Sequence, residues 1–97
     1  MRRGTTPTQV FHIAIDLTRA DCIYITYKQD GKIILEKDQT DITVGDRQLT
    51  VTLSQKDTLS FYPGMVTMQI RARVGDVSYA SNYMTTKIND ILKDGEI

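Results

Sequence analysis

The sequence predicts an all-β fold, an immunoglobulin-like β-sandwich of about seven strands, from three observations. First, residues 65–74 alternate between apolar and polar side chains, as a strand with one buried face requires, because successive side chains point to opposite faces. Second, shorter segments of the same kind recur at intervals of roughly 8–12 residues. Third, turn signals separate these segments. A small β-barrel is the alternative, because strand patterns alone do not distinguish it from a sandwich.

The first predicted strand spans residues 9–17. One of its faces is apolar and consists of Phe11, Ile13, Ile15 and Leu17. Residues 1–8 before it are polar, include Pro7 and show no period. We expect them to form a flexible amino-terminal arm unless a partner orders them.

The next two predicted strands form a hairpin. Residues 22–28 are rich in β-branched and aromatic side chains, which a pleated, half-buried surface favours. Asp30-Gly31 then separates this strand from the apolar residues 32–36. An Asp-Gly pair between two strands indicates a type I′ turn, which needs positive φ at both central residues.

The middle of the chain predicts a second hairpin and a helical turn. Residues 42–44 form a short strand, residues 45–47 turn the chain, and residues 48–53 alternate on the return. Ser54 with Asp57 three positions later then matches the residues that cap the first turn of a helix.

The last third of the chain contains the longest predicted strand. Pro63-Gly64 is a turn that precedes residues 65–74, and Gly75-Asp76 connects them to a second strand-like segment within residues 77–88. The apolar set of the long strand is Val66, Met68, Ile70, Ala72 and Val74.

The end of the chain leaves the strand pattern. Ile88, Ile91 and Leu92 have helical spacing, which predicts a single turn over residues 89–93 that covers an open end of the core. We therefore expect one sandwich domain over residues 9–92 and an exposed tail over residues 93–97.

Composition excludes several classes of function. Twelve lysines and arginines balance twelve aspartates and glutamates, whereas nucleic-acid binders and polybasic membrane patches need a surplus of basic groups. The longest apolar runs are three residues, so no transmembrane span or export signal is expected. A single cysteine, Cys22, makes no intramolecular disulfide. We expect a soluble protein made in a reducing cytoplasm.

No set of residues predicts catalysis or a cofactor. A metal site or a nucleophile needs converging partners, and His12 and Cys22 are the only imidazole and the only thiol in the chain. The aspartates fall mostly in turns, where backbone hydrogen bonding favours them. We therefore expect a non-enzymatic protein with no metal and no cofactor.

One group of residues suggests a protein interface. Arg71 and Arg73 stand on the polar face of the longest strand, with Tyr79 and Tyr83 near them if the hairpin is in register. Clusters of arginine and tyrosine are favoured at protein interfaces. The alternative is a solvated outer face with ordinary cross-strand pairs.

Several segments in order resemble a known group of proteins. They are Arg2–Thr8, Ile15–Leu17, Ile25–Gly31, Leu53–Leu59, Gln69–Arg71, Ala80–Asn82 and Ile91–Ile97. Together they resemble short uncharacterised proteins encoded by prophages and phages of Gram-positive bacteria. More loosely, the strand pattern is similar to the amino-terminal β-sandwich of phage baseplate upper proteins. The resemblance implies a structural or accessory protein of the tail or baseplate that contacts virion proteins or itself, located in the virion after synthesis.

A carbohydrate-binding module is the second functional hypothesis. Such a module would use Tyr24, Tyr62 or Tyr79 as a stacking platform for a sugar.

Overall fold

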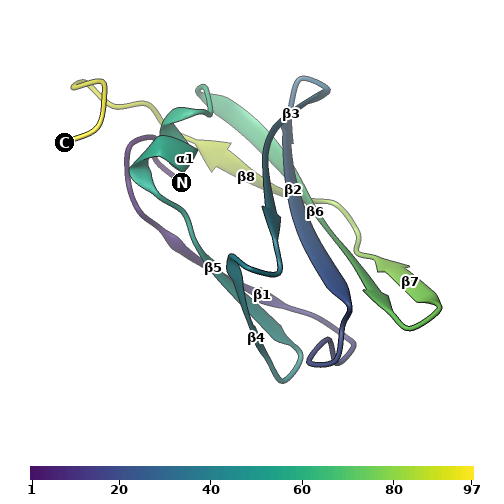
Figure 1. Cartoon of the computed structure of the whole chain (residues 1–97). Helices are drawn as coiled ribbons and strands as arrows, with labels where there is room; N and C mark the ends of the chain where they lie inside the picture. Colours follow the sequence, from purple (N-terminus) through teal and green to yellow (C-terminus); the bar gives the residue numbers. More distant parts are fainter.

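The computed structural model describes residues 1–97 and shows two antiparallel sheets packed face to face (Figure 1). The smaller sheet has the strand order β1-β5-β4, and the larger has the order β3-β2-β6-β7, with β8 also paired to β6. In chain order the elements are β1 (Thr8–His12), β2 (Cys22–Gln29), β3 (Lys32–Asp38), β4 (Ile42–Gly45), β5 (Gln48–Thr52), α1 (Gln55–Leu59), β6 (Gly64–Val74), β7 (Val77–Ala80) and β8 (Met84–Ile88). The two separate sheets confirm a β-sandwich rather than a barrel.

The core lies between the two sheets and contains the side chains that the alternation placed there. In β6, Val66, Met68, Ile70 and Ala72 are buried while the side chains between them are not, so the predicted face is confirmed. The buried cluster as a whole is Phe11, Leu17, Ile23, Ile25, Tyr27, Ile42, Leu49, Val51, Leu53, Phe61, Val66, Met68, Ile70, Ala72 and Ile88. Burying these apolar side chains is the main term that holds the sheets together.

The two predicted Gly-Asp and Asp-Gly hairpins are both present. Asp30 and Gly31 have φ values of 48° and 76°, so both central residues of the β2–β3 turn adopt the positive φ that a type I′ turn needs. Gly75 has φ 58° in the two-residue turn that joins β6 to β7, where Val74 pairs with Val77.

The capped helical turn is also confirmed. The Ser54 hydroxyl accepts the Asp57 amide at 3.0 Å, and the Asp57 carboxylate accepts the Ser54 amide at 2.9 Å, which is a complete capping box. The same carboxylate lies 2.8 Å from the Lys37 ammonium of β3, so the short helix is tied to the larger sheet.

Two glutamines satisfy polar groups inside the molecule. The hydroxyl of Tyr27 in the larger sheet donates to the Gln9 side-chain oxygen of the smaller sheet at 2.6 Å. The amide of Gln29, which is 2% exposed, bonds to both the carbonyl and the N–H of Tyr62, at 2.7 and 3.0 Å. No buried side-chain nitrogen or oxygen lacks a hydrogen-bond partner.

The first strand is shorter than predicted. β1 ends at His12, although the Ile13 amide still donates to the Arg47 carbonyl at 3.0 Å. The length of β1 is limited by its partner strand β5. Because β5 begins at Gln48, which pairs with His12, β5 has no residues left to pair with residues 14–17. These residues still contribute to the core, since Leu17 is buried and Ile15 packs against the cluster.

The segment 77–88 is two strands rather than one, which makes eight strands in all. Arg71 of β6 pairs with Ala80, whereas Met68 pairs with Met84. Two residues of β6 therefore face three residues, 81–83, on the opposite strand, and this extra residue is a β-bulge. As a result, the side chains that face the core are the odd-numbered ones in β7 and the even-numbered ones in β8.

The ends of the chain differ from the expectation. Residues 1–3 pack against the rest of the molecule: Arg2 forms a parallel bridge with Asn89, and the Arg3 guanidinium donates to the Phe61 carbonyl at 2.8 Å. The amide of Asn89 in turn donates to the Met1 carbonyl at 2.8 Å. This extended pairing prevents the predicted helical turn over residues 89–93, and Leu92 is fully exposed instead of covering the core.

Candidate functional site

The strongest candidate site is the face of the larger sheet that is turned away from the core, here called the outer face. Its residues alternate with the buried ones along β2 and β6, and the register places further residues of β3 and β7 beside them. The residues with side chains on this face include Cys22, Tyr24, Thr26, Lys28, Ile33, Glu36, Met65, Thr67, Gln69, Arg71, Arg73 and Tyr83.

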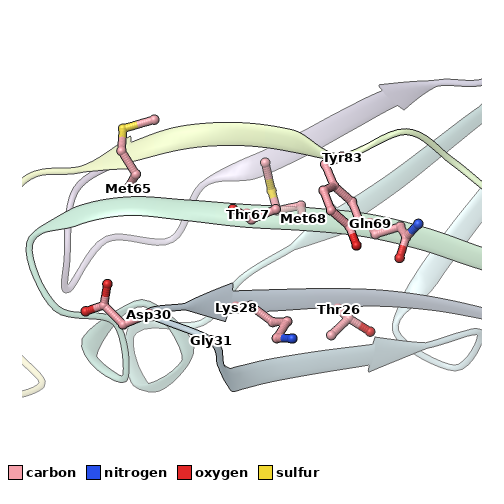
Figure 2. A pocket seen from close by; sticks show the side chains of 9 residues that line it. All are labelled: Thr26, Lys28, Asp30, Gly31, Met65, Thr67, Met68, Gln69 and Tyr83. Carbon is pink, nitrogen blue, oxygen red and sulfur yellow. The ribbon is translucent and has the colours of Figure 1, made fainter.

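Two adjoining hollows of about 450 Å³ each lie on the outer face. Figure 2 shows the first, where Tyr83 lies over β6 beside Gln69 and the side chains of Lys28 and Thr26 lie on the neighbouring strand. The second is lined by Tyr24, Glu36, Arg71 and Arg73 among others, and it shares Thr26 with the first. The two hollows therefore form one continuous, shallow surface.

Arg71 and Arg73 lie on the polar face of β6, as the sequence predicted. The two guanidinium groups differ from each other in their partners. Arg71 stands between Tyr24 on β2 and Ala80 on β7, and its guanidinium makes no hydrogen bond or ion pair. Arg73 donates to the Gly75 carbonyl at 3.1 Å and lies 3.8 Å from the Asp21 carboxylate. Arg71 is thus an exposed cation with no partner in this chain.

The two predicted tyrosines lie on opposite faces of the sheet. Tyr79 pairs with Ala72, which is a buried position, so Tyr79 projects toward the core side and does not reach the arginines' face. Tyr83 is the last residue of the bulged segment 81–83 and lies on the outer face with Gln69 and Thr67. Of the four predicted interface residues, the structure brings together Arg71, Arg73 and Tyr83 on one face and separates Tyr79 from them.

Three further exposed apolar side chains lie on this face and were not among the predicted interface residues. Tyr24 is 40% exposed, Met65 57% and Ile33 61%. The alternation itself contained the signal for the first two, because Tyr24 and Met65 occupy the positions between buried residues of β2 and β6. Ile33 is different, since a register shift in β3 places it opposite Lys28.

Local hydrogen bonds at a strand end, in a loop, at the helix cap and near the chain end account for the carboxyl groups whose pKa is lowered. Hydrogen bonds from Thr40 lower the pKa of Asp38, and hydrogen bonds from the Ile91 amide and Arg3 lower that of Asp90. No group of three or more His, Cys, Asp or Glu side chains is placed to hold a metal ion. Cys22 lies on the outer face and His12 on the smaller sheet. The outer face offers stacking surfaces, apolar contact and an unpaired guanidinium, which are groups that protein interfaces use.

The tyrosines of the carbohydrate hypothesis do not share a platform. Tyr24 lies on the outer face and Tyr79 on the core side. The Tyr62 hydroxyl donates to Asp30 at 3.1 Å, which holds its ring beside the β2–β3 turn.

Comparison with known proteins assigns this chain to no family: no protein-family model, curated protein or solved structure matches it at a significant level. None of its helices has the length and apolar character needed to cross a bilayer.

Proposed function

We propose that this chain is a non-enzymatic structural or accessory protein of a bacteriophage particle, in the tail or baseplate region, that binds a virion protein through its outer face. The observation that carries the proposal is the composition of that face: Tyr24 is exposed opposite the unpaired Arg71, and Tyr83 and Met65 are exposed farther along the same face. Tyrosine, methionine and arginine are enriched at protein interfaces, where a few such residues supply most of the binding energy. The resemblance to short phage proteins supports a virion protein as the partner.

The flat shape of the face also favours a protein partner. A drug-sized ligand is usually enclosed in a deep pocket. Here two open hollows extend along β2 and β6, and the residues on their floor are mostly polar side chains such as Thr26, Thr67 and Gln69. Protein interfaces combine aromatic and arginine side chains with polar ones, and this face does the same.

The test is incorporation of the protein into phage particles. Particles from a phage that encodes the chain are purified, and the chain is quantified by mass spectrometry. Arg71→Glu combined with Tyr24→Ala should reduce incorporation by about 30-fold or more, as expected if a hot spot worth about 2 kcal/mol is lost. Thr43→Glu, an exposed change on β4 of the other sheet, is the matched control and should incorporate normally. Absence of the wild-type chain from purified particles would overturn the proposal.

A further inference from the structure

Three side chains in a row across the outer face are an acid, an aromatic ring and a base. Asp38 of β3 and Arg71 of β6 both pair with Tyr24 of β2, which lies between them. Neighbouring strands are about 4.8 Å apart, so the acid and the base are held roughly 10 Å apart on either side of the tyrosine. We call these three residues the central row.

Neither charge of the central row has an ionic partner within the chain. The Arg71 guanidinium makes no hydrogen bond or ion pair. The Asp38 carboxylate accepts the Thr40 hydroxyl at 2.6 Å and the Thr40 amide at 2.9 Å, and both bonds end on Oδ1, so Oδ2 has no partner. The same two bonds lower the pKa of Asp38, which keeps the carboxylate charged at neutral pH. Each end of the row can therefore accept an opposite charge from outside the chain.

This arrangement is complementary to itself. When a second copy is turned by half a rotation about an axis that runs along β2, its β3 lies over β6 of the first copy and its β6 over β3. Tyr24 then meets Tyr24 of the second copy at the axis, and Asp38 lies over Arg71 on both sides of it. In the next row along the strands, the Glu36 carboxylate lies over the Gln69 amide in the same way. Such a contact uses one patch on both copies and closes as a pair.

The remaining charges of the outer face do not oppose this pairing. Arg73 lies 3.8 Å from the Asp21 carboxylate of its own chain. Lys28 is four residues along β2 from the central row, or about 13 Å away, and Asp30 lies in the turn beyond it. Lys87 is farther still, near the end of β8. Packed sheets cross at about 30°, which moves the two copies of Lys28 away from each other.

The two signs of charge in the central row select the occupant. A purely acidic surface would neutralise Arg71 but would be repelled by Asp38 and Glu36, and a purely basic surface would have the opposite conflict. Like charges placed against each other across an interface are strongly unfavourable. A second copy presents both signs at the required spacing, with a tyrosine between them.

We infer that two copies of this chain pair through their outer faces about a twofold axis along β2, with Asp38 of each copy bonded to Arg71 of the other. The contact covers few strands, so it belongs to the weak, transient class of interfaces, and the chain is monomeric at low micromolar concentration. A paired copy cannot use the same face on a particle. In that respect the inference rests on the proposed function, because it makes self-pairing a regulation of the particle contact.

The test is sedimentation equilibrium of the purified chain from low micromolar to millimolar concentration. Wild type should shift from monomer to dimer. Arg71→Asp and Asp38→Arg each place like charges at both contacts, so each alone should pair at least about tenfold more weakly. Asp38→Asn keeps an acceptor for Thr40 but removes the charge, and it should also weaken pairing. Thr43→Glu should behave as wild type, and unfolding midpoints should show that every variant is folded.

Mixing the two charge-reversal variants gives the decisive result. In a pair of Arg71→Asp with Asp38→Arg, both contacts again join opposite charges, so an equimolar mixture should form a heterodimer at a strength close to that of wild type. A wild-type chain that stays monomeric at millimolar concentration would overturn the inference, as would a mixture that stays monomeric. Either failure leaves incorporation into particles untouched, and a chain absent from particles could still pair in solution, so the two proposals fail separately.

Discussion

Ser81 replaces a missing strand neighbour for Ile70. The Ser81 amide donates to the Ile70 carbonyl at 2.8 Å, and the Ser81 hydroxyl accepts the Ile70 amide at 2.9 Å. This exchange bridges the gap in the β6 ladder where β7 ends and β8 has not begun. It matters for the site because the bulge held by Ser81 places Tyr83 on the outer face and Tyr79 on the core side.

Replacing Ser81 by alanine should destabilise the fold by about 1–2 kcal/mol, because the Ile70 amide is then left without its acceptor. Urea unfolding measures the change, and hydrogen exchange at the Ile70 amide should accelerate. Ser78→Ala is the matched control, since Ser78 lies exposed on β7 and its side chain makes no hydrogen bond. Equal effects from the two substitutions would contradict the role given to Ser81.

Gln29→Leu should cost about 2–4 kcal/mol, because the change leaves two partly buried backbone groups of Tyr62 unpaired beside the new apolar side chain. The leucine is similar in size, so lost packing contributes little. Urea unfolding again measures the cost. Gln48→Leu, a half-buried glutamine in β5 that makes no side-chain hydrogen bond, is the control and should change stability by less than about 1 kcal/mol. A near-neutral Gln29→Leu would mean that water satisfies Tyr62.

Stability should fall in acid through Asp57. Burial acts to raise the pKa of Asp57, but hydrogen bonds from Lys37 and Ser54 outweigh it and lower the pKa below the usual 3.8. A depressed folded-state pKa gives stability that is present above about pH 4 and is lost as the pH falls through the folded value. Unfolding free energies measured from pH 6 to pH 2 should therefore decline.

Asp57→Asn should flatten that decline, and Lys37→Met should flatten it partly, because it removes only one of the groups that lower the pKa. Both variants should be less stable than wild type at pH 6, where the ion pair is intact. A pH profile of Asp57→Asn parallel to that of wild type would rule out Asp57 as a source of the acid sensitivity.

Gly4→Ala tests whether the first residues are packed. Gly4 has φ +72°, and a Cβ there would lie 2.9 Å from the Ile91 side chain, so the substitution should cost about 1–2 kcal/mol. Thr6→Ala, at an exposed position nearby, should change stability by less than about 0.5 kcal/mol. If the two variants are equally stable in thermal or urea unfolding, residues 1–8 behave as the free arm that the sequence predicted.

Local patterns predicted the parts of the fold that depend on neighbouring residues. The alternation in β6, the Asp30-Gly31 turn and the capping box of Ser54 and Asp57 each depend on fewer than a dozen consecutive residues, and all three are present. The sandwich followed from repeating that pattern.

The features that were missed depend on residues far apart in the chain. β1 ends where β5 has no more residues to pair, and the predicted turn after Ile88 is replaced by pairing between Asn89 and residues 1–3. In the candidate site, a one-residue bulge places Tyr79 and Tyr83 on opposite faces of the sheet. The spacing of apolar residues over 77–88 does not predict this bulge. Period-two reasoning therefore placed Arg71 and Arg73 correctly but grouped the tyrosines on one face.

The most direct test of the central claim, that the outer face is a protein contact surface, is hydroxyl-radical footprinting of the chain free and within purified particles. In the free chain Met65, Tyr24 and Tyr83 should be oxidised, while Met68, which is 5% exposed, should be protected. In the particle the three outer-face residues should become protected, and Tyr62 should remain reactive. Unchanged oxidation of Met65 and Tyr83 in the particle would contradict the account.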